Sequence, residues 1–377
     1  MKKFIGFIGI FLLSMHGWGD VKPFMDQMLH EIFTIKPFIV SESSFKDPKN
    51  SEKIEGSLKK MIELSKKINH EDKIKKTGFQ VSGKMLTEQL SETELVFQHG
   101  NKDYAFWKLK STLGVCMSCH TQLPAVSTKF TTMNTSNILT NPFEEAEFLF
   151  VIRNFDEAMK LYSKALRDYP KNNVTMDSLE KAIYRQMFYY VRVKRDFKSL
   201  VKTLGEDKSN TKLPNRLLKN IDGLISAAEK MSSEPYPSFT IQQEAELRKY
   251  VETALKEELQ GNFNFEKARE ALLNLKVSSV LYEFLSQSPK TSLKPDILYW
   301  LSFCESYYTH QTFDSLPEMY LKQCVVEFPK QPVAKKCLKE YKDLILMAYT
   351  GSGGTNIPDD VNREIRAMEE LVNPKGK

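Results

Sequence analysis

The sequence predicts an all-α protein in which an N-terminal bundle of four helices is followed by a solenoid of helical hairpins. Apolar residues recur at alternating steps of three and four along much of the 377-residue chain, which is the period of an amphipathic helix. The alternation of strands and helices that a parallel sheet requires is missing from the pattern. In the second part of the chain, small and aromatic residues recur at the spacing of paired helices.

Residues 1–19 have the features of a secretory signal peptide. Two lysines precede an apolar run from Phe4 to Leu13, and Gly17 and Gly19 stand at positions −3 and −1 of a cut before Asp20. The run is too short to cross a membrane, and no cysteine near the cut suggests a lipid anchor. We therefore expect an exported, periplasmic protein without a membrane span.

The net charge of the expected mature chain is small. Cleavage removes Lys2 and Lys3 from the 54 basic residues, so 52 basic residues stand against 48 acidic ones and the charge falls from +6 to +4. A balance this close to zero indicates neither a nucleic-acid partner nor a membrane-surface partner.

Residues 20–124 are predicted to form the four-helix bundle. The helices are expected at about Val21–Pro37, after the polar segment 41–51, at about Phe79–His99 and at about Asp103–Thr121. Gly100 would end the third of these, and short connections favour antiparallel packing. Each helix has one apolar stripe, formed in turn by Met25, Met28, Ile32 and Ile35; by Ile54, Leu58, Met61, Ser65 and Ile68; by Phe79, Leu86, Leu90 and Phe97; and by Phe106, Leu109, Leu113, Cys116 and His120.

The sequence CMSCH at residues 116–120 is the clearest chemical motif. A zinc site would need four ligands, and no second Cys or His pair lies nearby in the sequence. A thioredoxin-like site would need a preceding strand. Two thiols one helical turn apart can bond the two vinyl groups of a porphyrin, while the next residue, His120, reaches the iron. We expect one covalent haem c at Cys116, Cys119 and His120, inside the bundle.

A four-helix domain with its single C-x-x-C-H motif near the end of the last helix resembles the cytochrome c-prime family. The resemblance covers about residues 21–124. It implies thioether bonds at Cys116 and Cys119 and a proximal iron ligand at His120.

Several residues could be the second axial ligand of the haem iron, on the side opposite His120. In an antiparallel bundle the start of the first helix lies beside the end of the fourth, so Met28, or else Met25, is at the height of a distal ligand. The alternatives are His70, Met85, Met133 and an iron with no distal ligand, and both methionines of the first helix also suit a simple core role. His99 is excluded because it precedes His120 by 21 residues, about 30 Å along a helix.

Residues 125–142 read as a linker rich in Ser, Thr and Asn, and residues 143–348 as helical repeats. The segment 146–170 resembles the tetratricopeptide repeat, with a weaker match at 295–329, and the alternative is an irregular helical domain. Such repeats present a concave surface to a protein or peptide. The matching positions of the first repeat are Ala146, Leu149, Phe155, Ala158, Tyr162, Ala165 and Pro170.

The C-terminal part contains the other cysteines and a last helix. We predict a disulfide between Cys324 and Cys337, 13 residues apart on successive helices, and a buried thiol at Cys304. Residues 349–377 are expected to form a loop, a helix that Pro358 opens and that runs to Val372, and a tail.

The predicted function is electron transfer by a periplasmic monohaem c-type cytochrome whose repeats dock a redox partner or another protein or peptide. The alternative is a haem-containing scaffold or sensor of redox state or of a small gas, in which the repeats carry the function. No acid–base or nucleophilic constellation stands out in the sequence, so we do not expect an enzyme.

Overall fold

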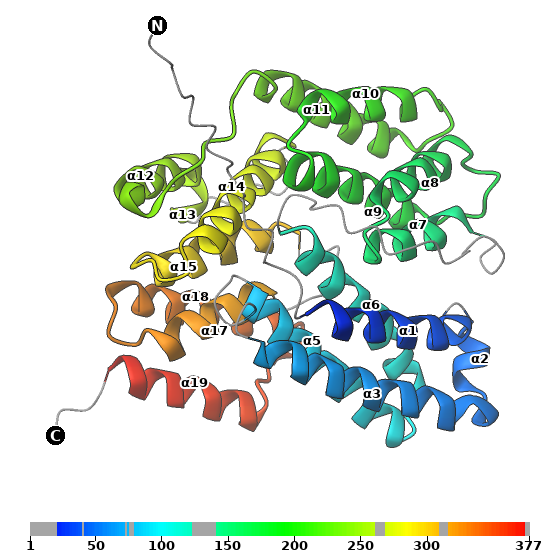
Figure 1. Cartoon of the computed structure of the whole chain (residues 1–377), viewed down its shortest axis with the longest axis horizontal. Helices are drawn as coiled ribbons and strands as arrows, with labels where there is room; N and C mark the ends of the chain where they lie inside the picture. The colour runs from blue at the N-terminus through cyan, green and yellow to red at the C-terminus, as the bar shows by residue number, and fades with distance from the viewer. Residues whose placement is uncertain are drawn as a thin grey trace, which may run out of the picture.

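The computed structural model describes residues 21–39, 41–71, 74, 79–122, 141–260, 268–308 and 316–373. These residues are predominantly helical and contain almost no strand, which confirms the all-α prediction (Figure 1). The proposed signal peptide and most of the proposed linker lie outside the described residues.

The N-terminal part consists of α1 (Lys22–Ile39), the short α2 (Glu42–Lys46) and 3-10 turn η1 (Pro48–Asn50), α3 (Ser51–His70), α5 (Phe79–Gln98) and α6 (Lys102–His120). Helix α1 packs on α3, α3 on α5 and α5 on α6, and α6 also contacts α1. Helix α1 continues two residues beyond Pro37, where the first helix was expected to end. Gly100, with φ +83°, and Asn101, whose side chain caps the amide of Tyr104, form the turn between α5 and α6.

One end of this helix group is filled by aromatic side chains. Phe45 of α2 is fully buried, and its ring centroid lies 5.3 Å from those of Phe97 on α5 and Phe106 on α6. Phe106 belongs to the first half of α6, whereas His120 ends the same helix. The aromatic cluster and the CMSCH motif therefore lie toward opposite ends of α6.

The second part of the chain continues as helices, most of which pack on a neighbour in sequence, while α11 also packs on α14. They are α7 (Pro142–Val151), α8 (Phe155–Arg167), α9 (Met176–Met187), the π-helical η2 (Phe188–Val193), α10 (Phe197–Asp207), α11 (Asn215–Met231), the 3-10 turn η3 (Ile241–Gln243), α12 (Glu244–Ala254), α13 (Lys256–Leu259), α14 (Ala268–Gln287), α15 (Lys294–Ser306), α17 (Leu316–Glu327), α18 (Pro332–Ala348) and α19 (Asp359–Val372). In the first hairpin, α7 packs against α8, and the small residues Ala146, Ala158 and Ala165 are fully buried.

The chain curves back on itself, so that its late helices return to the first group (Figure 1). Helix α7 contacts α6, and α17 contacts α5. At the second contact the Gln323 amide donates to the Gln80 side-chain oxygen at 3.0 Å, and Lys84 Nζ lies 3.6 Å from Glu327 Oε1. The N-terminal helices are therefore held from two sides.

A disulfide joins Cys324 of α17 to Cys337 of α18, and Cys304 of α15 is buried and in no disulfide. After α18, the strands β1 (Thr350–Gly351) and β2 (Gly354–Thr355) form a small antiparallel hairpin. Pro358 then precedes α19, which ends at Val372 as predicted.

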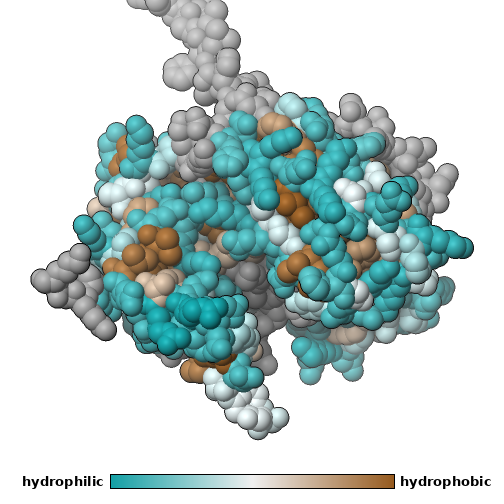
Figure 2. All heavy atoms as spheres, turned by 90° about the horizontal axis from the view of Figure 1, so that it is seen from below, coloured by the Kyte–Doolittle hydropathy of each residue, from teal (hydrophilic) through white to brown (hydrophobic). Residues whose placement is uncertain are grey.

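The outer surface is polar over most of the face in Figure 2, with small hydrophobic patches that are separated from one another. Among the described helices, none combines the length and the apolar composition that a membrane span requires.

Candidate functional site

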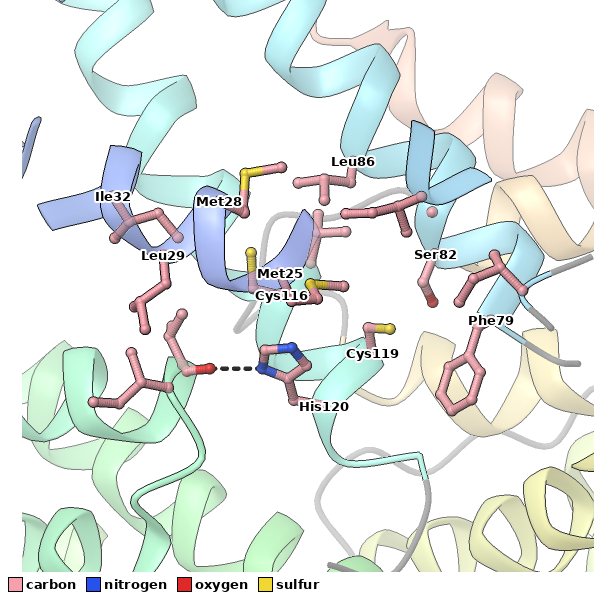
Figure 3. Close-up of a pocket in the computed structure, with 16 residues that line it drawn as sticks. Met25, Met28, Leu29, Ile32, Phe79, Ser82, Leu86, Cys116, Cys119 and His120 are labelled. Carbon is pink, nitrogen blue, oxygen red and sulfur yellow. Dashed lines mark hydrogen bonds between the residues drawn. The ribbon is translucent and has the colours of Figure 1, made fainter. Parts of the chain in front are cut away.

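A cavity lies where α1, α5 and α6 meet the end of α7 (Figure 3). It contains about 690 Å³ of space between atoms, part of which opens to solvent. Its lining is mainly apolar and consists of Met25, Met28, Leu29, Ile32, Ile68, Ile74, Phe79, Ser82, Gly83, Leu86, Val115, Cys116, Cys119, His120, Val151 and Ile152.

The last turn of α6 places the three motif side chains at this cavity. Residues three and four apart share one face of a helix, so Cys119 and His120 both lie near the side of α6 that carries Cys116. The end of α6 is tied to α5, because the Gln122 amide donates a 2.8 Å hydrogen bond to Ser82 Oγ. The motif therefore sits on a helix end whose position is set by a buried polar contact.

His120 is fixed by the end of α7. Its Nδ1 lies 2.6 Å from the carbonyl oxygen of Val151, and because a carbonyl only accepts, Nδ1 carries the proton. Burial, with a contribution from the charge of Arg153, lowers the pKa of His120 to about 4, against the effect of this hydrogen bond. At neutral pH the imidazole is therefore neutral with a bare Nε2, and Figure 3 shows the second ring nitrogen of His120 turned away from the dashed hydrogen bond.

The two cysteines are thiols at neutral pH. Burial raises the pKa of Cys116 to about 12. Burial also raises the pKa of Cys119 to about 12, with a smaller contribution from Cys116, while Arg153 acts in the opposite direction. The two residues are not joined in a disulfide. A high thiol pKa is the opposite of the low value that marks a catalytic or redox-exchanging cysteine.

Two methionines of α1 line the same cavity. Met28 is buried and Met25 is half-buried, and Figure 3 shows both on the α1 side, with Met25 and Cys116 close together in the view. The structure thus brings Met25, Met28, Cys116, Cys119 and His120 to one place. Of the alternatives, Met85 and the exposed His70 are not among the described residues that line the cavity, and Met133 lies outside the described residues.

The contribution of the C-terminal end of α7 was not predicted from the sequence. Val151 and Ile152 complete the cavity, and the Val151 carbonyl holds His120, although both residues lie beyond the segment 20–124. Every residue has a backbone carbonyl, so the identity of Val151 contains no signal for this role. Only the contact between α6 and α7 reveals it.

The described residues include no cluster of three or more His, Cys, Asp or Glu side chains that is arranged to hold a metal ion. Neither a protein-family model, nor a curated protein, nor a solved structure matches this chain. A functional proposal therefore depends on the motif and on the cavity around it.

Proposed function

We propose that this chain is a periplasmic monohaem c-type cytochrome that transfers electrons. The observation that carries the proposal is that one apolar cavity brings together two thiols, a neutral histidine with a bare Nε2 and two methionine thioethers. A thiol pair one helical turn apart, followed directly by His, is the pattern of covalent haem attachment.

The residues present fit a haem. Cys116 and Cys119 would each add their S–H across a vinyl group and so form thioether bonds, and His120 Nε2 would bind the iron. The bond from Nδ1 of His120 to the Val151 carbonyl is the kind of outer contact that fixes the tautomer of a ligating histidine and makes it a stronger donor. The apolar walls, formed largely by α1 and α5, suit the face of a porphyrin.

The bound group would supply one-electron chemistry, and the chain would set the reduction potential. A thioether from Met28, or else from Met25, opposite His120 would raise the potential relative to two nitrogen ligands. The buried walls would keep water from the iron and limit the reorganisation that accompanies a change of charge. Both effects favour an electron carrier.

The remaining parts of the proposal concern export and docking. Residues 1–19 would direct the chain to the periplasm, where c-type haem is attached. The residues from α7 to α18 would form tetratricopeptide-like hairpins that present a surface to a redox partner or to another protein or peptide. The buried small residues of the α7–α8 hairpin support this part, because they allow the close helix approach on which such repeats depend.

The proposal is tested by expressing the full chain for export in a host that attaches haem c. The purified protein should stain for haem after denaturation, and the stain should be lost when Cys116 and Cys119 are both changed to Ala. Cys304→Ala, at a buried thiol of α15 remote in sequence from the motif, is the matched control and should keep the stain. A parent protein without covalent haem would contradict the proposal.

A visible spectrum separates electron transfer from sensing. Sharp reduced bands that carbon monoxide does not change indicate an iron with two protein ligands and favour an electron carrier. Broad bands that sharpen with carbon monoxide indicate an open iron, and they would move the assignment to a gas-binding sensor.

A further inference from the structure

An open groove lies between α8 and α10, the second helices of two successive hairpins, and the π-helical η2 contributes Tyr189 and Tyr190 to its lining. The Tyr189 hydroxyl donates to Asp156 Oδ1 of α8 at 2.6 Å. The Tyr190 hydroxyl accepts from Thr203 Oγ1 of α10 at 3.0 Å. The two tyrosines therefore connect η2 to both walls of the groove, and π-helical turns of this kind are frequent at functional sites.

Two buried acceptors without a hydrogen bond lie directly behind this lining. Ser163 of α8 lines the groove and donates to Asp207 Oδ2 at 3.0 Å, and Gln186 Nε2 donates to the same oxygen at 2.7 Å. Asp207 and Gln186 are both fully buried. Among the residues that the structure describes, neither Asp207 Oδ1 nor Gln186 Oε1 has a hydrogen-bond partner. A buried acceptor that lacks a donor costs free energy, which a donor from outside the chain can recover.

Arg167 approaches these acceptors without satisfying them. Its side chain lines the groove and is 45 % exposed, and its Nε lies 3.9 Å from Asp207 Oδ1, which is too far for a hydrogen bond. Burial raises the pKa of Asp207, although its two hydrogen bonds and the charge of Arg167 oppose this shift. The donors of the chain itself therefore leave the buried carboxylate incompletely stabilised.

We propose that this groove binds a guanidinium group whose N–H donors reach Asp207 Oδ1 and Gln186 Oε1. A guanidinium carries several donors in one plane, is weakly hydrated and stacks on aromatic rings. The groove offers two acceptors of different side chains, and the rings of Tyr189 and Tyr190, with centroids 5.0 Å apart, line it. The group can belong to a small alkylguanidinium or to an arginine of a partner protein.

In this proposal Arg167 is the competitor of the ligand. Both acceptors are covered in the structure, so the Arg167 side chain has to turn toward solvent before a second guanidinium can reach them. That movement breaks no hydrogen bond to Asp207, because the two groups are 3.9 Å apart. The ligand then takes the place that Arg167 approaches.

Two variants change the site in opposite directions. Asp207→Asn removes the charge and keeps the shape, and it should weaken binding about tenfold or more, as the loss of a charged acceptor does. Arg167→Met removes the competing cation and should tighten binding. Lys160→Met is the matched control for the second variant, because Lys160 also lines the groove but pairs with Glu157 at 2.7 Å. Asp222→Asn, at an exposed carboxylate of α11, is the control for the first and should bind like the parent.

The experiment is a ligand-observed NMR titration of the exported full chain at neutral pH with three probes. They are ethylguanidinium, N-acetylarginine amide and the neutral N-acetylcitrulline amide. We expect the first two to bind and the citrulline probe not to bind. Equal affinities of the two cations support a small guanidinium as the ligand, whereas tighter binding of the arginine probe supports an arginine of a partner protein.

Three results would overturn the inference: no binding of either cation, a citrulline probe that binds as tightly as the arginine probe, or affinities that D207N leaves at the parent value. Urea unfolding shows whether D207N is folded. If it is not, R167M keeps the test in place, since an affinity that R167M changes no more than K160M does also contradicts the proposed site. The groove shares no lining residue with the cavity at the CMSCH motif, so its test does not depend on haem and its failure leaves the proposed function untouched.

Discussion

Met25 and Met28 stand three residues apart on α1, and both reach the cavity that contains His120. Met28 is buried, with 5 % of its surface exposed, whereas Met25 is only half-buried. A buried thioether is better shielded from water and needs less reordering to serve as an iron ligand. For the haem that we propose, the difference in burial therefore favours Met28 over Met25 as the distal ligand.

We expect Met28→Leu to lower the reduction potential and to open the iron to carbon monoxide, because leucine fills similar volume without a sulfur. The change should cost less than about 1.5 kcal/mol in the free energy of unfolding, as volume-conserving core substitutions do. Visible spectra and potentiometry of the haem-loaded chain provide the measurement. Met25→Leu is the control and should bind haem like the parent. If Met25→Leu opens the iron and Met28→Leu does not, the ligand assignment is wrong.

The motif residues could be predicted from the sequence because their chemistry is local. Cys116, Cys119 and His120 lie within five residues, and helix geometry alone brings their side chains to one side of α6. The methionines of α1 required one further step, the antiparallel order of helices. The Val151 carbonyl could not be found in this way, because its position depends on how α7 packs against α6.

At the scale of elements, a buried ion pair joins η2, α14 and α15. Arg192 is fully buried, and its Nη2 donates to Glu305 Oε1 at 2.7 Å and to Ser278 Oγ at 2.8 Å. Tyr282 donates to the same Glu305 oxygen at 2.7 Å. The pair thus connects three elements through groups that water cannot reach.

Glu305→Leu should destabilise the protein by about 3–5 kcal/mol, because it leaves the Arg192 charge buried without its counter-charge. The double variant Arg192→Met with Glu305→Leu should recover a large part of this loss, since no unpaired charge remains. Urea unfolding of the single and double variants gives the two free energies. A double variant that is no more stable than Glu305→Leu would show that the unpaired charge is not the cause.

Asp207 connects α8, α9 and α10 and makes their packing depend on pH. Its carboxylate is fully buried and accepts from Gln186 Nε2 at 2.7 Å and from Ser163 Oγ at 3.0 Å. Burial raises the pKa of Asp207 above its ordinary value, although these hydrogen bonds and Arg167 oppose the shift. In the window from the ordinary value of about 3.9 up to the raised one, the folded state binds more protons than the unfolded state.

The contribution of Asp207 to the free energy of unfolding should therefore fall as the pH rises through that window. Asp207→Asn removes the titration and should flatten this part of the profile of stability against pH. The measurement is urea unfolding at a series of pH values on either side of the window. Asp222→Asn, at an exposed carboxylate of α11, is the control and should leave the slope near that of the parent. A slope that Asp207→Asn does not change would contradict the assignment.

The residues at which helices begin and end were easier to predict from the sequence than the elements against which those helices pack. Gly100 ends α5 and Pro358 opens α19, as local backbone rules require. Pro37, in contrast, lies inside α1, since α1 runs on to Ile39. The π-helical turn at Phe188–Val193 had no recognised signal either, because an aromatic run such as residues 188–190 fits an α-helix equally well.

At the scale of the whole molecule, the return of α17 to α5 closes the chain into a ring (Figure 1). The hydrogen bond between Gln323 and Gln80 spans 243 residues of sequence. No pattern of period three or four contains information about such a pairing, so the sequence could not predict it. The consequence is that the N-terminal helices around the motif are braced by the last hairpins as well as by α7.

Glu327 is the centre of this closing contact. Its Oε1 accepts from the Gln323 amide at 2.7 Å and lies 3.6 Å from Lys84 Nζ, and its Oε2 lies 3.5 Å from Lys294 Nζ. Glu327→Lys would place a third cation beside two lysines. Since each of these ion pairs is partly exposed, we expect a modest total loss of about 1–2 kcal/mol in the free energy of unfolding.

The loss should be concentrated where the ring closes, so amide hydrogen exchange should become faster in the first turns of α5 and in α17 but not in α10 and α11. Lys84→Glu combined with Glu327→Lys restores one opposite-charge pair across the contact and should slow the exchange again. Lys339→Glu, at an exposed lysine of α18 that pairs with Asp343, is the matched charge reversal away from the contact and should leave α5 unchanged. Exchange in α5 that does not respond to Glu327→Lys would mean that the N-terminal helices keep their stability without α17, and that α7 alone braces the end of the molecule that carries the CMSCH motif.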